Sequence, residues 1–160
     1  MNLVNLALES IEKFGEMVSL VYEGKEYTNV QIHEEGDRLA AGLSKLGLSK
    51  GDKIIVCAPN CPEILTSYGA ILKMGCTIIP VLFLLQAEEI RYIMENSEAR
   101  ATITSEELVD KIRSAAGQVP SMRHIVVIGE KEIEGTVPYK KLVEENEPGF
   151  GVVDVDRDAL

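Results

Sequence analysis

The chain has 160 residues, of which 46% are hydrophobic and 26% charged, a composition typical of globular proteins and not of disordered or fibrous ones. Its formal net charge of -10 argues against nucleic acid as a partner, because a phosphate backbone requires a basic surface. No apolar run approaches the roughly 18 residues that a transmembrane segment needs, and no basic segment opens a signal peptide. Three cysteines are too few for a disulfide framework, so we expect a cytoplasmic protein.

Residues 1–28 predict a helix followed by a β-hairpin. Apolar side chains recur at helical spacing over residues 3–14. Two short β-prone runs then flank Glu23-Gly24, which is typical of a two-residue hairpin turn. Thr28 and Gln31 have the spacing of a capping box, which predicts that a second helix starts here.

Residues 29–146 predict an α/β core, because short runs rich in β-branched residues alternate with amphipathic helices. The strands that we expect are residues 54–57, 77–81, 101–104 and 125–128. Such alternation implies right-handed crossovers. We therefore predict a three-layer α/β fold: a mainly parallel, doubly wound sheet with helices on both faces, plus the N-terminal helix and hairpin. Residues 147–160 lack periodicity and predict an extended tail of the same single domain, residues 1–160.

Two helix starts in the core have polar residues at capping-box spacing. Asn60 stands three residues before Glu63, with Pro62 in the first turn, and Thr104 stands three residues before Glu107. We expect Asn60 and Thr104 to cap helices and not to contact a ligand.

The sequence predicts no catalytic and no cofactor-binding residue. Ligands of open parallel sheets bind beyond the carboxyl ends of the strands. The residues expected there supply neither a nucleophile beside a base nor a carboxylate cluster. Phosphate-loop, dinucleotide-binding and nucleophile-elbow patterns do not occur.

The cysteines and histidines predict no metal site. Cys57 and Cys61 are four residues apart and Cys76 is distant, which is not the ligand spacing of a zinc site. We interpret Cys57 and Cys76 as small core residues. We expect His33 to be solvated and His124 to have a structural or surface role.

Three segments together resemble a known family. Residues 46–63 read L-G-L-S-K-G-D-K-I-I-V-C-A-P-N-C-P-E, residues 75–80 read G-C-T-I-I-P, and residues 88–99 read E-E-I-R-Y-I-M-E-N-S-E-A. In this order and spacing they resemble the N-terminal region of the adenylate-forming (AMP-dependent synthetase and ligase) superfamily. The resemblance is greatest to acyl-CoA synthetases and long-chain fatty acid–CoA ligases.

This resemblance implies a role in a larger enzyme. Such an enzyme would use ATP and Mg²⁺ to convert a carboxylic acid to an acyl-adenylate, and then transfer the acyl group to coenzyme A. The family's phosphate loop, of the form T-S-G-[ST]-T-G, would follow a segment like residues 156–160. We therefore expect an N-terminal subdomain that is inert alone, with the remainder of its own polypeptide as its partner.

Leu82, Phe83 and Leu84 are the candidate substrate-pocket residues. They follow Pro80, and after this proline the family often has Asn and small residues, as in P-x-N-P, where this chain has Leu82 and Phe83. One interpretation is a loop that packs on the sheet. The other is a wall of an apolar pocket completed by a missing domain, which would favour a fatty or otherwise hydrophobic acid.

Two further hypotheses belong to other classes. The chain could be a stand-alone α/β module that binds a nucleotide or acyl group without catalysis. It could also be an interaction module that exposes apolar surface and forms a homo-oligomer.

Overall fold

The computed structural model describes residues 2–155 and contains a five-stranded parallel sheet. Its strands are β3 (Lys53–Cys57), β4 (Thr77–Pro80), β5 (Ala101–Ser105), β6 (His124–Ile128) and β7 (Val137–Pro138). They lie in the order β4-β3-β5-β6-β7, and every neighbouring pair is parallel. The short strand β7 was not predicted.

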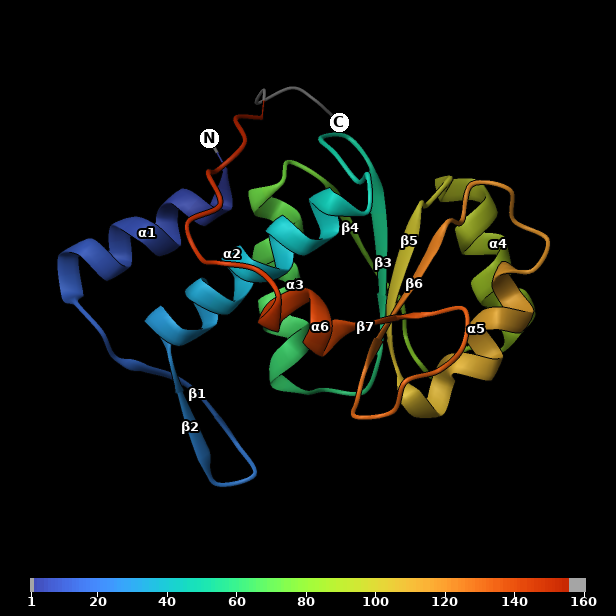
Figure 1. The fold of residues 1–160 in the computed structure, drawn as a ribbon, viewed down its shortest axis with the longest axis horizontal. Coiled ribbons are helices and arrows are strands. Elements are labelled where there is room, and N and C mark those ends of the chain that lie inside the picture. Colours follow the sequence, from blue (N-terminus) through green and yellow to red (C-terminus); the bar gives the residue numbers. More distant parts are fainter. Residues whose placement is uncertain (1, 156–160) are drawn as a thin grey trace.

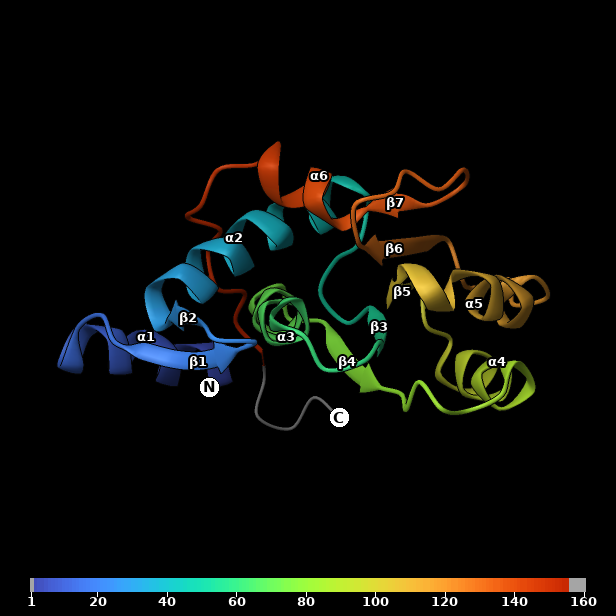
Figure 2. The same cartoon turned by 90° about the horizontal axis from the view of Figure 1, so that it is seen from below.

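Helices cover both faces of this sheet (Figures 1 and 2). One face carries α2 (Asn29–Lys45), α3 (Pro62–Lys73) and α6 (Tyr139–Glu144). The other face carries α4 (Ala87–Ser97), the 3₁₀ turn η1 (Glu106–Leu108) and α5 (Val109–Ala116). The predicted doubly wound α/β class is therefore confirmed.

The inner strand β3, between β4 and β5, supplies side chains to both hydrophobic cores. Ile54 and Val56 are buried in the core beneath α2, α3 and α6. Ile55 and Cys57 point the other way and are buried in the core beneath α4 and α5. Successive side chains of a strand face opposite sides, so an uninterrupted apolar run is what a strand covered on both faces requires.

The N-terminal elements lie outside the α2–α3 layer (Figure 1). They are α1 (Leu3–Phe14) and the antiparallel hairpin of β1 (Val18–Tyr22) and β2 (Lys25–Thr28). The two-residue turn is confirmed, since Glu23 and Gly24 both have positive φ, at 50° and 79°. The capping box of Thr28 and Gln31 is confirmed as well.

The chain after α6 has no regular secondary structure up to residue 155, and it runs back across the α2–α3 layer (Figure 1). The Val153 amide donates to the Lys73 carbonyl oxygen at 2.8 Å. The Asn2 side-chain amide donates to the Val153 carbonyl oxygen at 3.3 Å and to the Leu72 carbonyl oxygen at 2.6 Å. The two ends of the described chain are thereby tied to the same end of α3. The rest of the predicted tail, residues 156–160, lies outside the described residues.

Both predicted caps in the core are wrong. The N-cap of α3 is Cys61, not Asn60, and its side chain makes no capping bond. Pro62 explains the shift: proline favours the first helical position and keeps the preceding residue extended. Thr104 lies inside β5, which continues to Ser105, and its hydroxyl donates to the Cys57 carbonyl oxygen at 2.8 Å.

Two helical glycines provide a test of the packing between α2 and α6. At Gly42 of α2, a Cβ atom would lie 2.8 Å from the Leu142 Cβ, whereas at Gly69 of α3 it would meet nothing within 4 Å. We expect Gly42→Ala to lower the free energy of unfolding by about 1–3 kcal/mol, because it overpacks a close helix contact. Gly69→Ala should leave it unchanged or raise it by up to about 1 kcal/mol, because alanine is the better helix former.

Urea denaturation of both variants measures this difference. Equal effects of the two substitutions would mean that α2 and α6 do not approach each other as described.

Candidate functional site

The carboxyl ends of β3 and β5 form the topological switch point of the sheet. After β3 the chain turns into α3 on one face, and after β5 it turns into η1 and α5 on the other. Doubly wound sheets bind ligands in the crevice between two such strands. The hydroxyl of Ser105, at the end of β5, is buried and has no hydrogen-bond partner among residues 2–155.

Glu106, which follows this switch point, has a structural role. Its carboxylate accepts a hydrogen bond from the Lys131 amide at 2.7 Å and lies 3.3 Å from the Lys131 ammonium. These donors lower the pKa of the Glu106 carboxyl, the backbone N–H of Lys131 most of all. Gly129 makes room for this arrangement, since a Cβ there would lie 2.1 Å from Glu106 Oε1.

The three candidate pocket residues lie in the loop after β4. Leu82 is 69% exposed and Leu84 is 72% exposed, whereas Phe83 packs partly buried against the core under α4 and α5. The loop is held by Lys111, whose ammonium donates to the carbonyl oxygens of Phe83 and Leu85 at 2.8 and 3.1 Å. The backbone of the loop is thus held in place, while the side chains of Leu82 and Leu84 are exposed to solvent.

A buried polar cluster, not predicted from the sequence, joins α2 to α3. The Lys73 ammonium forms an ion pair and hydrogen bond with Asp37, and the side chains are only 4% and 7% exposed. The other carboxylate oxygen of Asp37 accepts a hydrogen bond from the Gly149 amide at 2.8 Å. His33 completes the cluster, with its Nε2 3.2 Å from Lys73 Nζ.

The protonation of this cluster follows from its burial. Burial lowers the pKa of the Lys73 amine to about 8, so the amine is still mainly charged at pH 7, where it pairs with the Asp37 carboxylate. Burial, and then the Lys73 charge, lower the pKa of His33. Lysine can only donate, so His33 Nε2 must accept and the ring is the neutral Nδ1–H tautomer. His33 is therefore half-buried and not solvated as predicted.

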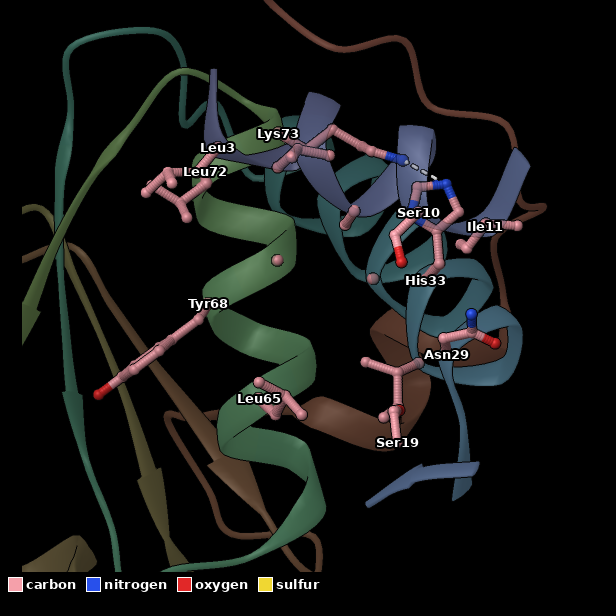
Figure 3. Close-up of a pocket in the computed structure, with 15 residues that line it drawn as sticks. Leu3, Ser10, Ile11, Ser19, Asn29, His33, Leu65, Tyr68, Leu72 and Lys73 are labelled. Carbon is pink, nitrogen blue, oxygen red and sulfur yellow. Dashed lines mark hydrogen bonds between the residues drawn. The ribbon is translucent and has the colours of Figure 1, made fainter. Parts of the chain in front are cut away.

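The same two helices, together with α1, line a cavity of about 450 Å³ that is open to the outside (Figure 3). Apolar side chains from all three helices make up most of its wall; they are Leu3, Val4, Ala7, Ile11, Ile32, Leu65, Tyr68 and Leu72. His33 and Lys73 supply a polar end, where Figure 3 shows the contact between them. We call this the α1–α3 cavity.

Sequence alone contained only part of the signal for this site. His33 and Asp37 stand four residues apart in α2, a spacing that places them on one face of a helix. Lys73 is 36 residues from Asp37, and only the tertiary contact between α2 and α3 brings the two together.

Burial keeps the three cysteine thiols in their neutral form. Cys57 and Cys76 are buried, and burial raises the pKa of both thiols, that of Cys76 to about 11. Burial also raises the pKa of Cys61 to about 11. All three are therefore mainly protonated at neutral pH, whereas a reactive nucleophile is a thiolate.

Neither a metal-binding cluster nor a membrane-spanning helix occurs in the described part of the chain. Within residues 2–155, no three His, Cys, Asp or Glu side chains gather closely enough to hold a metal ion. Over the same residues, no helix is long and apolar enough to cross a bilayer.

Comparison with protein families gives one match that covers most of the chain. The family described as "AMP-binding enzyme" matches residues 8–158. Among curated proteins, an uncharacterized acyl-CoA ligase of Bacillus subtilis, YtcI, is 33% identical over 120 residues, which cover 72% of this chain and 22% of that protein. A medium/long-chain-fatty-acid–CoA/3-oxocholest-4-en-26-oate–CoA ligase of Mycobacterium marinum is 28% identical over 80% of this chain and 23% of its own length.

Solved structures share the fold at lower identity. The anthranilate CoA ligase AuaEII, in complex with anthranoyl-AMP, superposes with a TM-score of 0.90 at 24% identity, over 99% of this chain and 30% of that protein. A long-chain-fatty-acid–CoA ligase from Archaeoglobus fulgidus gives a TM-score of 0.88 at 22% identity, over 99% and 33%. The chain thus spans about a quarter of the length of the curated relatives.

A double-mutant cycle tests the buried ion pair. We expect Asp37→Leu and Lys73→Met each to lower the free energy of unfolding by about 3–5 kcal/mol, because each leaves one buried charge without its partner. The double variant should cost clearly less than the sum of the two, because no unpaired charge remains.

Lys141→Met provides the control in the same urea titrations. It removes an exposed pair, in which Lys141 Nζ lies 3.8 Å from Glu145 Oε1, and should cost less than about 1 kcal/mol. Additive effects of the Asp37 and Lys73 substitutions would contradict the pairing.

Proposed function

The chain belongs to the AMP-binding enzyme family, and from this we propose that it is the N-terminal subdomain of an acyl-CoA ligase whose catalytic residues lie outside these 160 residues. The whole enzyme would join a carboxylic acid to AMP, releasing pyrophosphate. It would then transfer the acyl group to the thiol of coenzyme A, releasing AMP. The observation that carries the proposal is the match over residues 8–158 to a family whose curated relatives are acyl-CoA ligases about four times as long.

ATP, Mg²⁺ and coenzyme A are the cofactors of this proposal, but residues 2–155 do not by themselves fit them. Magnesium prefers carboxylate and phosphate oxygens, and the described residues gather no such carboxylate cluster. The chain also has no glycine-rich phosphate loop. We therefore assign no catalytic step to residues of this subdomain, and we propose that it is inert alone.

The contribution of this subdomain would be a rigid wall of the substrate cleft. The loop after β4 is fixed by Lys111 and presents Leu82 and Leu84 beyond the carboxyl end of an edge strand. Exposed leucines on a fixed backbone suit the burial of an apolar acyl chain. This supports a fatty or otherwise hydrophobic acid as the substrate class.

Acid-dependent exchange of pyrophosphate into ATP tests the proposal. We expect none from the 160-residue chain, and exchange with medium- and long-chain fatty acids from the longer polypeptide that carries it. Exchange by the 160-residue chain, or no ligase activity in the longer protein, would overturn the proposal.

In the longer protein, Leu84→Asp should raise the KM for the acid by about 10-fold or more, since a charge would replace an apolar contact worth about 1.5–3 kcal/mol. The control is Val21→Asp, which alters a side chain of the hairpin that is 61% exposed and should change KM less than twofold. Equal effects of the two substitutions would exclude the loop from the substrate cleft.

A further inference from the structure

The α1–α3 cavity lies apart from the proposed substrate cleft. It is lined mainly by α1, α2 and α3, and α1 lies on the side of α2 and α3 that faces away from the sheet (Figure 2). The loop with Leu82 and Leu84 instead leads from the edge strand β4 to the opposite layer, where Phe83 packs. A ligand in this cavity would therefore not occupy the proposed substrate cleft, and its binding does not require the proposed acyl-CoA ligase function.

We propose that the α1–α3 cavity is an accessory binding site for an uncharged, mainly apolar small molecule, whose one hydrogen-bond-accepting oxygen accepts from the Lys73 ammonium beside His33. A long-chain alcohol is the simplest member of this chemical class.

The size and lining of the cavity suit such a molecule. Its volume of about 450 Å³ lies within the range of small-molecule sites, roughly 300–1,000 Å³. Aliphatic side chains from three helices line most of it, and Ser10, Ser19 and Asn29 also contribute to the lining. Two of the lining side chains, Leu3 and Leu65, are 66% and 44% exposed. A bound apolar chain would remove this surface from water, which is favourable.

The polar end of the cavity selects against a charged ligand. The Lys73 ammonium is the cation that lines it, and Asp37 behind the cavity wall already neutralises that charge. A carboxylate entering this apolar space would therefore lose its hydration without gaining an unmatched positive charge. An uncharged ligand avoids this loss.

The polar end offers a ligand one hydrogen-bond donor, which is why we expect the ligand to have one acceptor oxygen. The Lys73 ammonium has three N–H donors, of which one goes to Asp37 and one faces His33 Nε2 at 3.2 Å. The third is available to an alcohol or carbonyl oxygen, which would bind at the polar end while the apolar part lies along α1 and α3.

Gly69 provides a variant that fills the cavity without disturbing the packing. It lines the cavity from α3, and an added Cβ there would meet nothing within 4 Å. Gly151 provides the matched control: a Cβ there would also meet nothing within 4 Å, but the residue lies in the segment after α6 and does not line the cavity.

Methyl NMR titration of the 160-residue chain with 1-octanol and with octanoate at pH 7 tests the proposal. We expect octanol to shift the methyl signals of Ile11, Leu65 and Leu72 saturably, and to leave those of Ile112 and Val119, in the opposite core, unchanged. Octanoate, which is ionised at this pH, should bind at least tenfold more weakly. Gly69→Leu should weaken octanol binding at least tenfold, whereas Gly151→Leu should not.

Three results would overturn the proposal. The first is no saturable shift with octanol, or shifts centred on the opposite core. The second is octanoate binding as tightly as octanol, which would place the ligand's polar end in water and not at Lys73 and His33. The third is wild-type affinity in a folded Gly69→Leu variant. The first two comparisons use the unaltered chain, so they decide the matter even if Gly69→Leu does not fold.

Discussion

The structure depends on strand β3, which is buried on both faces. β3 pairs with β4 on one side and β5 on the other, and its alternating side chains enter two separate hydrophobic cores. Ile54 and Ile55 are each 0% exposed although they face opposite ways. Any change that moves β3 would disturb both cores, so the two helix layers are coupled through it. The same strand also ends at the switch point, where doubly wound sheets bind their ligands.

On the α2–α3 side, a polar contact accompanies this apolar packing. The Asp37–Lys73 pair fixes α2 against α3, and the Gly149 amide brings the chain after α6 to the same carboxylate. Charges are costly to bury unless they are paired and hydrogen-bonded, as these are. The pair also leaves the polar end of the α1–α3 cavity with no net charge, which is why we assign that cavity an uncharged ligand. One interaction thus contributes to stability and to the selectivity of the proposed site.

The sequence predicted the layers well and the sites poorly, for physical reasons. An uninterrupted apolar run such as Ile54–Cys57 indicates a buried strand directly, because a strand covered on both faces must be apolar throughout. The Asn60 cap failed because Pro62 fixed the helix start one residue later than the capping-box pattern indicated. The cluster around Lys73 was missed because its members come from two helices, and only tertiary packing brings them together. The role of Leu82 and Leu84 in an acyl pocket remains a prediction, made from their apolar character and their exposure.

Native-state hydrogen exchange is the most direct test of the coupling through β3. The backbone amides of β3 and β5 should exchange only by global unfolding, with one free energy of opening equal to that from urea denaturation. The amides of α1 and of the β1–β2 hairpin, which lie outside the sheet, should open at lower free energies. Suppose instead that the amides of α4 and α5 open as one unit and those of α2 and α3 as another, without global unfolding. The two cores would then be independent, and the account would be wrong.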